Sequence, residues 1–427
     1  MPPMTTSDVR TIGEDHSDLI EFLQKRGYAA PLVISDPNTH AAAAGRLVSA
    51  LGGAGIGAED FVLAEGEPAA DATSVGDILI GMKTTPDAVI GVGGGTVVDV
   101  ARLVAHRIDR AFLSYPTAPS VDAYASPTSA MIFRGVKHTV PGRTPEAVFV
   151  NTDVLSRSPH RMIASGFGDI IAKLTAVPDW QLAALLAGEG IDEGIVERTM
   201  GAVRVCVDAA DPISTHEAGG LKTLINALID SGDCMTDWGG SRPASGSEHL
   251  LSHFWEMRAL RDGTHSALHG EKVALGTVLV AGVFARLRQT GPEALAERIS
   301  AASRPSMEDL TARAQAGFGA ASAEALLADH FLATMTEAEF VGLRRAAADA
   351  AGAVCEIAEQ VPEPAHVREL MSRVGGPTSP ADIGVSVDDV RDALSAALFI
   401  RNRFGVLVFW HLFGLGDLDD LPGAVFS

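Results

Sequence analysis

The pattern of apolar residues changes once along this chain, and that change constrains the fold more than any other feature. Over residues 30–150, short apolar runs that suit strands alternate with segments of helical periodicity. Such alternation is typical of parallel strands joined by crossover helices. The predicted strands are PLVIS (31–35), FVLAE (61–65), DAVIGV (87–92) and AFLSYPT (111–117), with AMIF (130–133) and AVFVN (147–151) as further strands around a hairpin or flap.

From about residue 160 to 416 the β-branched runs disappear, and Ala, Leu and Glu recur at helical spacing. This pattern predicts an all-helical second domain. The polar segment SRSPHRM (156–162) marks the change, so we predict an α/β domain over 1–158 and a helical domain over 159–427. The apolar segment 395–417 is interrupted by Arg401 and Arg403, which leaves no run long enough to span a bilayer. It predicts a buried helix.

Composition narrows the class of protein. A chain of 427 residues suggests two domains rather than one core. Its formal net charge of −21 disfavours nucleic acid and anionic membranes as partners, and it requires a locally basic pocket for any anionic substrate. Three cysteines without metal-type spacing predict reduced thiols. The first residues lack the pattern of a signal peptide. We therefore expect a cytoplasmic protein with no membrane insertion and no bound nucleic acid.

A glycine-rich turn, GVGGGTVVDVA (91–101), joins a predicted buried strand to a helix. Glycines there let the backbone approach a pyrophosphate, and a helix N-terminus offers N–H donors. Thr96 stands where the usual dinucleotide fingerprint has its third glycine, and no Gly-Lys-Ser/Thr follows. A simple tight turn therefore stays open as an alternative. Asp36 ends an earlier strand, where its carboxylate could accept from a ribose hydroxyl or be an ordinary loop aspartate.

Two further segments carry candidate residues. The segment 114–131, SYPTAPSVDAYASPTSAM, is rich in hydroxyls and prolines and follows a strand, which favours a ligand-facing loop around Asp122 over ordinary loop composition. Asp169 lies in SGFGDIIAKLTAVPDW (165–180), near the start of a predicted helix. By itself, Asp169 is better explained by helix capping or by the helix dipole than by metal binding.

Four of the thirteen histidines fall in one window, as two pairs spaced i, i+4: His249 with His253, and His265 with His269. On helices each pair would share a face, and neutral imidazoles so placed commonly hold a divalent cation. Together with these histidines, Asp169 is better interpreted as the carboxylate of a two-His, one-Asp site. Such a site leaves a coordination position open for a substrate oxygen. A buried core histidine is the alternative for His253, and a polar surface position is the alternative for His265.

Taken together, GVGGGTVVDVA, SYPTAPSVDAYASP, SGFGDIIAKLTAVPDW and SRPASGSEHLLSH…HGEKVALGT strongly resemble the sn-glycerol-1-phosphate dehydrogenase family. That family belongs to the superfamily of dehydroquinate synthase, glycerol dehydrogenase and iron-containing alcohol dehydrogenase. The resemblance is clearest over residues 87–282. It implies a dehydroquinate synthase-like fold, with a Rossmann-like nucleotide-binding domain, an all-α metal-binding domain and an active site in the cleft between them.

The resemblance also implies roles for individual residues. Asp169, His249 and His269 would bind one divalent metal; zinc is the first choice, and nickel or iron fit the same ligands. His253 and Asp122 are the candidate catalytic residues, with His253 or a metal-bound water passing the proton. NAD or NADP would be the cofactor, and Arg242 and Lys173 are candidates to hold a substrate phosphate. The cofactor-binding set would be Asp36, Gly93, Gly94, Gly95, Thr96, Asp99, Thr117, Ser120 and Ser126.

The implied reaction is the reversible reduction of dihydroxyacetone phosphate to sn-glycerol 1-phosphate by a homo-oligomer, a dimer or higher. Lys173 occupies the position where iron-type alcohol dehydrogenases have another histidine, and Asp169 replaces the glutamate of dehydroquinate synthases. Two alternatives stay open: a glycerol dehydrogenase that acts on the unphosphorylated polyol, and a dehydroquinate synthase-type cyclase.

Overall fold

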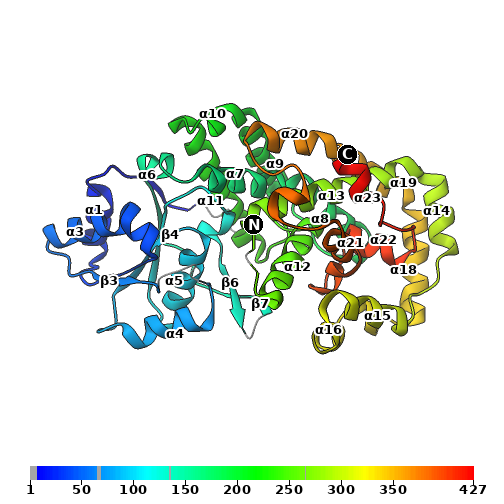
Figure 1. Ribbon diagram of the computed structural model, residues 1–427, viewed down its shortest axis with the longest axis horizontal. Helices are drawn as coiled ribbons and strands as arrows, with labels where there is room; N and C mark the ends of the chain where they lie inside the picture. Colours follow the sequence, from blue (N-terminus) through cyan, green and yellow to red (C-terminus); the bar gives the residue numbers. More distant parts are fainter. Residues whose placement is uncertain (1–6, 65–68, 134–135, 265) are drawn as a thin grey trace. The chain divides into compact units, whose positions relative to one another are not determined.

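In a computed structural model of the chain, residues 7–64, 69–133, 136–264 and 266–427 are described (Figure 1). The chain forms two compact units, one of residues 1–170 with 201–240 and the other of residues 171–200 with 241–427. We predicted two domains, each a continuous segment, with the boundary at residues 158/159; where the domain boundary lies stays a prediction. In the compact units, the chain instead leaves the second unit and returns to the first at residues 201–240.

The first unit contains a six-stranded parallel sheet in the order β1-β8-β5-β4-β2-β3. The strands are β1 (Val9–Thr11), β2 (Leu32–Ser35), β3 (Glu59–Val62), β4 (Ala88–Gly93), β5 (Ala111–Pro116) and β8 (Ala147–Val150). The predicted parallel α/β class is thus confirmed, and β1 is a short strand that the sequence pattern did not predict. From β2 the chain runs outward to the edge strand β3, whereas from β4 it runs the opposite way to β5. The direction of winding therefore reverses between β2 and β4, where ligands of such sheets usually bind.

Helices and short turns connect the strands of this unit. They are α1 (Ser17–Arg26), α2 (Pro37–Thr39), the π-helical turn η1 (His40–Ala44), α3 (Gly45–Gly53), α4 (Ala72–Gly81), α5 (Gly95–Arg107), the 3-10 turn η2 (Asp122–Ala125), α6 (Thr152–Ser156), α7 (His160–Ile171), α10 (Ala210–Ser214) and α11 (Ala218–Trp238). Where we predicted strands around a hairpin or flap, the structure has an antiparallel hairpin of β6 (Thr128–Phe133) and β7 (Val136–Pro141), while AVFVN forms β8 of the parallel sheet.

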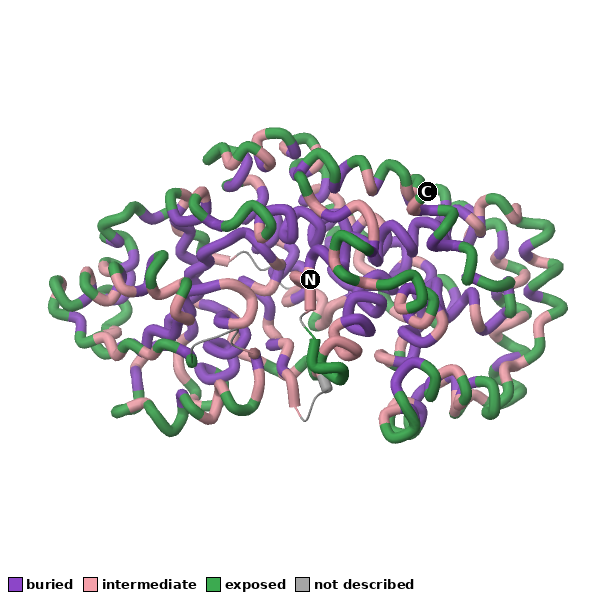
Figure 2. The backbone as a smooth tube through the Cα atoms, viewed as in Figure 1, coloured by how far each residue is buried: buried purple, intermediate pink, exposed green. Residues whose placement is uncertain are grey.

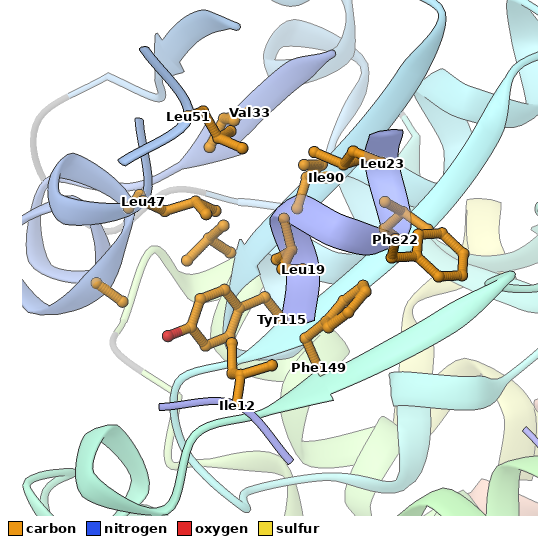
Figure 3. Close-up of a cluster of buried hydrophobic side chains, with 14 of the residues drawn as sticks. Ile12, Leu19, Phe22, Leu23, Val33, Leu47, Leu51, Ile90, Tyr115 and Phe149 are labelled. Carbon is orange, nitrogen blue, oxygen red and sulfur yellow. The ribbon is translucent and has the colours of Figure 1, made fainter. Parts of the chain in front are cut away.

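Apolar side chains from the sheet and from α1 and α3 pack into one core on a face of the sheet (Figure 3). Leu19 and Phe22 of α1 lie against Tyr115 of β5 and Phe149 of β8, and all of these residues are buried. The strands read as nearly continuous apolar runs because both faces of a parallel sheet are covered. This packing fixes the edge of the sheet from which the candidate ligand loops extend.

The second unit is helical, as predicted. Its helices are α8 (Lys173–Ala187), α9 (Glu193–Asp208, which continues into the first unit), α12 (Ser247–Asp262), α13 (His269–Thr290), α14 (Pro292–Ala301), α15 (Met307–Phe318), α16 (Ala320–Leu327), α17 (Phe331–Thr334), α18 (Glu337–Asp349), α19 (Ala351–Glu359), α20 (Pro364–Arg373), η3 (Pro380–Ile383), α21 (Val387–Ala396), η4 (Ala397–Phe399), α22 (Val406–Leu412) and α23 (Leu421–Phe426). The middle of α13 is buried throughout residues 270–285, so this helix is the axis of the unit (Figure 2).

The predicted buried helix over 395–417 is wrong. The chain leaves helical structure after η4, runs irregularly through residues 400–405 and forms α22 only from Val406. Gly405 is the N-cap residue of α22, and a Cβ there would lie 2.6 Å from Asp179 Oδ2, so the close packing at the start of α22 requires glycine. The apolar residues on both sides are buried, as expected, whereas Arg401 and Arg403 lie in the break and are partly exposed.

One helical stretch of the described residues, 160–187, is long and apolar enough to cross a membrane by length and composition. However, 72% of its most apolar window is buried inside the fold, which is the pattern of a core helix. The three cysteines are buried, and none of them forms a disulfide within the described residues.

Candidate active site

The glycine-rich turn lies between β4 and α5, at the reversal point of the sheet. Gly94 is the N-cap residue of α5, and among the described residues no side chain caps this end of the helix. A Cβ on Gly93 would lie 2.5 Å from Val97 Cβ, so glycine is required for the close packing of strand on helix. The turn therefore presents backbone N–H groups at a helix N-terminus, an arrangement that suits a phosphate.

Two other predicted cofactor residues follow neighbouring strands at the same edge. Asp36 follows β2, which pairs with β4, and its Oδ1 accepts from the N–H of Thr39 at 2.8 Å. Asp36 thus caps the short helix α2, a role that the sequence analysis did not predict for it. Thr117 follows β5, and its N–H donates to the carbonyl of Gly93 at 3.2 Å. The sheet brings Asp36, the glycine turn and Thr117 together, although the sequence separates them widely.

Asp99 and Ser126, also assigned to the cofactor, bind within the protein instead. Arg102 Nη1 donates to Asp99 Oδ1 at 2.9 Å and to the carbonyl of Thr128 at 3.0 Å. Ser126 Oγ donates to that same carbonyl at 3.1 Å. Burial raises the pKa of Asp99 to about 6, even though Arg102 opposes the shift. These residues hold the loop after η2 against α5. Ser120, also in the predicted set, shares a hydrogen bond of 3.1 Å with the hydroxyl of Tyr124.

Asp122 and Asp169 contact each other directly. The N–H of Asp122 donates to Asp169 Oδ2 at 2.9 Å, and Ser231 Oγ donates to Asp122 Oδ2 at 2.9 Å. Asp169 is fully buried on α7. The predicted ligand-facing loop thereby orients the carboxylate that was predicted to bind metal.

The histidines of the predicted cluster lie on two helices. His249 and His253 are one turn apart on α12, and His269 is the first residue of α13. The ring of His249 lies 5.3 Å from that of His269, and the ring of His253 lies 6.0 Å from it, measured between centroids. His265 falls outside the described residues. The first predicted i, i+4 pair therefore shares a helix, whereas α13 begins only at the second member of the other pair.

Glu248 fixes the orientation of the His249 ring. Its Oε1 lies 2.8 Å from His249 Nδ1, and because an ionised carboxylate only accepts, Nδ1 carries the proton and Nε2 is left as the ligand nitrogen. The pKa of the fully buried Glu248 is raised by burial, but the hydrogen bond and charge of His249 outweigh this and keep it below its usual value. Glu271, two residues after His269, caps the start of α13, where its Oε2 accepts from the N–H of Leu268 at 2.9 Å.

Asp179 is a second buried carboxylate that the sequence analysis missed. It accepts from the N–H and the Oγ of Ser247, both at 2.7 Å, and so anchors the start of α12. Burial, followed by repulsion from Glu248, raises the pKa of Asp179 to about 6. Asp179 lies in the segment 165–180 that the sequence analysis singled out, but its hydrogen-bond partners, Ser247 and Val406, could not be predicted from the sequence.

One oxygen of Asp169 and one ring nitrogen each of His249 and His269 all lie within 4.8 Å of one another. A carboxylate oxygen with two imidazole nitrogens is a donor set that suits a divalent transition metal. Protein donors on three helices, with Asp169 and His249 buried and His269 half-buried, fit a three-ligand site with an open position, and Glu248 orients one of them.

Arg242 is held within the protein. Its guanidinium forms an ion pair with Glu189 and donates to the carbonyl of Phe404 at 2.9 Å. Its charge is therefore already balanced by a carboxylate.

Comparisons with known proteins place this architecture in a superfamily. Residues 12–159 match the family model of iron-containing alcohol dehydrogenase. A glycerol dehydrogenase from Schizosaccharomyces pombe superposes over 99% of this chain and 91% of its own, with a TM-score of 0.58 at 17% identity. A probable glycerol dehydrogenase from Sinorhizobium meliloti covers 99% of both chains, with a TM-score of 0.61 at 17% identity. At such identities the likeness establishes the fold alone.

Curated relatives identify the branch. The glycerol-1-phosphate dehydrogenase (NAD(P)+) of Geobacillus stearothermophilus is 32% identical over 93% of this chain and 90% of its own length. The enzyme of the same name from Geobacillus thermodenitrificans is 31% identical over 92% and 89%. That of Sulfurisphaera tokodaii is 42% identical over 46% of this chain and 55% of its own. The chain belongs to the glycerol-1-phosphate dehydrogenase family.

Proposed function

We propose that this protein catalyses the reversible, NAD(P)-dependent reduction of dihydroxyacetone phosphate to sn-glycerol 1-phosphate at a divalent metal. The observation that carries the proposal is the grouping of Asp169, His249 and His269 in a chain whose curated relatives have this activity in their names. When bound, the metal supplies a Lewis acid for the ketone and the nicotinamide supplies the hydride.

The protein's own residues would position these partners. The loop of Asp122 holds the Asp169 carboxylate, and Glu248 holds the His249 ring, so both donors are oriented before a metal arrives. The N–H groups of the β4–α5 turn would bind the cofactor pyrophosphate. Asp36, at the end of the adjacent strand, would accept from a ribose hydroxyl and favour NADH over NADPH.

His253 would accept or pass the proton of the substrate oxygen. It lies one turn from His249 on α12, with its ring 6.3 Å from the His249 ring. Its Nε2 lies 3.5 Å from Arg401 Nη2 and its Nδ1 lies 3.6 Å from Glu256 Oε2, and an imidazole is the side chain most often used for such proton transfer. Zinc is the metal we favour, and we further propose a homo-oligomer that acts in the cytoplasm.

Initial rates with dihydroxyacetone phosphate, free dihydroxyacetone and glycerol, measured side by side with both nicotinamide cofactors, test the proposal. We expect the phosphorylated ketone to be reduced with by far the highest kcat/KM, and NAD(P)H to be consumed in proportion to product. The product should be a glycerol phosphate that an sn-glycerol-3-phosphate-specific dehydrogenase does not oxidise. A preference for free dihydroxyacetone or glycerol would instead make this protein a glycerol dehydrogenase. Turnover without net consumption of the cofactor would point to a cyclase.

A further inference from the structure

Two arginines occupy the irregular segment between η4 and α22. Arg401 Nη1 donates to Ser241 Oγ at 2.8 Å, and Arg403 Nη2 donates to Ser245 Oγ at 3.0 Å. Arg403 Nη1 also reaches Ser241 Oγ, at 3.4 Å. Both side chains are partly exposed. The serine hydroxyls thus hold two guanidinium groups beside each other while part of each remains accessible.

Within the described part of the chain, no carboxylate lies within ion-pair distance of either guanidinium. The carboxylates that influence them, Asp179 and Glu248, already accept from other donors: Asp179 from Ser247, and Glu248 from Thr175 Oγ at 3.0 Å and from His249. Burial lowers the pKa of both arginines, and repulsion from its neighbours lowers that of Arg403 further. By contrast, the nearby Arg242 has its own carboxylate, Glu189. Two adjacent cations without a carboxylate of their own are typical of an anion-binding site.

This pair of cations lies close to the candidate metal ligands. Arg401 contacts the His253 ring, and that ring lies 6.3 Å from His249 and 6.0 Å from His269 between centroids. One imidazole therefore separates the arginines from the two histidines. A small substrate could place its oxygen at the histidines and an anionic group at the arginines.

We propose that Arg401 and Arg403, held by Ser241 and Ser245, bind the phosphate group of the substrate and so determine the preference for a phosphorylated ketone. This inference rests on the proposed function. The two guanidinium groups would each donate to phosphate oxygens, and the serine hydroxyls, which accept from the arginines, keep their own hydrogens for the same phosphate. The phosphate would also supply the negative charge that the arginine pair lacks.

The test compares Arg403→Ala and Arg403→Lys with wild type on two substrates. We expect Arg403→Ala to lower kcat/KM for dihydroxyacetone phosphate by about tenfold to a hundredfold, the range for one lost charge-assisted contact. The low activity on free dihydroxyacetone should change little. Arg403→Lys keeps the positive charge but not the planar set of N–H donors of a guanidinium, so it should lose less kcat/KM for dihydroxyacetone phosphate than Arg403→Ala. Arg288→Ala is the matched control, because Arg288 is a partly buried arginine at the far end of α13, bound to two carbonyls and to Glu363.

A binding measurement keeps the inference separate from the proposed function. Calorimetric titration with inorganic phosphate should give a weaker affinity for Arg403→Ala than for wild type and Arg288→Ala, at an unchanged melting temperature. If wild type prefers unphosphorylated substrates, the proposed function fails, and a phosphate affinity that still depends on Arg403 would retain the anion site. Equal losses on both substrates, or a phosphate affinity unchanged in Arg403→Ala, would overturn the inference and leave the proposed function intact. Should Arg403→Ala not fold, Ser245→Ala takes its place, with a smaller loss in the same direction.

Discussion

The two candidate ligand-binding regions of this protein are built in different ways. At the β4–α5 turn the donors are backbone N–H groups. The turn requires residues without a side chain, such as Gly93, where a Cβ would clash with Val97. In the helical unit the functional atoms belong to side chains, and each depends on a second residue: His249 on Glu248, Arg401 on Ser241, and the start of α12 on Asp179. A site made of backbone is specified by one continuous motif, whereas a site made of side chains requires several distant segments to pack correctly.

The largest effect should come from removing a side chain on which the helical site directly depends. We expect His249→Ala to lose its stoichiometric metal and at least about a thousandfold in kcat/KM, because a Lewis acid contributes several kcal/mol to stabilising the transition state. Metal content by plasma mass spectrometry and steady-state rates measure both losses. His366→Ala, a change of an exposed histidine on α20, should leave metal and activity unchanged. Full activity of metal-free His249→Ala would remove the metal from the proposed mechanism.

The next effect concerns the buried support of α12. The pKa of Asp179 is about 6 in the folded protein against 3.8 for a free aspartate side chain, so the folded state binds more protons between these values and loses stability as pH rises through them. The difference corresponds to at most about 3 kcal/mol. Asp179→Asn cannot titrate, so the stability of wild type relative to this variant should fall as pH increases from about 4 to about 7.

Denaturant titrations at several pH values measure this difference. Asp388→Asn, which changes an exposed carboxylate on α21, is the control and should show no such trend. A constant difference between wild type and Asp179→Asn across this range would contradict the raised pKa.

In the sheet unit, an added methyl group should be enough to damage the backbone site. Gly93→Ala places a Cβ 2.5 Å from Val97 Cβ, so we expect a loss of about 1–3 kcal/mol in unfolding free energy and weaker binding of NADH, at unchanged metal content. Thermal melts and fluorescence titration measure the two. Gly76→Ala, at an α4 position with open space around it, should be neutral or slightly stabilising. Unaltered nucleotide affinity in a destabilised Gly93→Ala would make the turn a packing element only.

The smallest effect should separate the two roles of Asp36. Asp36→Ala removes a helix cap worth about 1 kcal/mol and, if the carboxylate also binds ribose, raises the NADPH to NADH ratio of kcat/KM. Asp71→Ala is a matched control, because Asp71 caps α4 through Ser74 at the same distance of 2.8 Å. The control should lose the same stability without any change in cofactor preference. An unchanged ratio in Asp36→Ala would reduce this residue to its capping role.

Local sequence was informative where neighbours along the chain decide the structure. The strands β2, β4 and β5, the hairpin and α12 were predicted because their periodicity is set by which faces are buried. The three metal-ligand candidates were found through quoted motifs, and they converge in space. Glu248 was missed although it directly precedes His249, because nothing in the sequence distinguishes an orienting carboxylate from a helix-start glutamate.

By itself the sequence determined the order of an α/β part and a helical part, the glycine turn and the candidate ligands, because these depend on residues within a few turns of one another. Only the tertiary structure decided that the apolar segment 395–417 leaves helical structure over residues 400–405 and brings Arg401 and Arg403 to Ser241, Ser245 and His253. The tertiary structure likewise decided that Arg242 forms an ion pair with Glu189 and that Arg102 donates a hydrogen bond to the Asp99 carboxylate. The physical reason is that tertiary packing decides which residue lies next to a charged side chain. Residues 160 positions apart share no local sequence pattern from which their contact could be predicted.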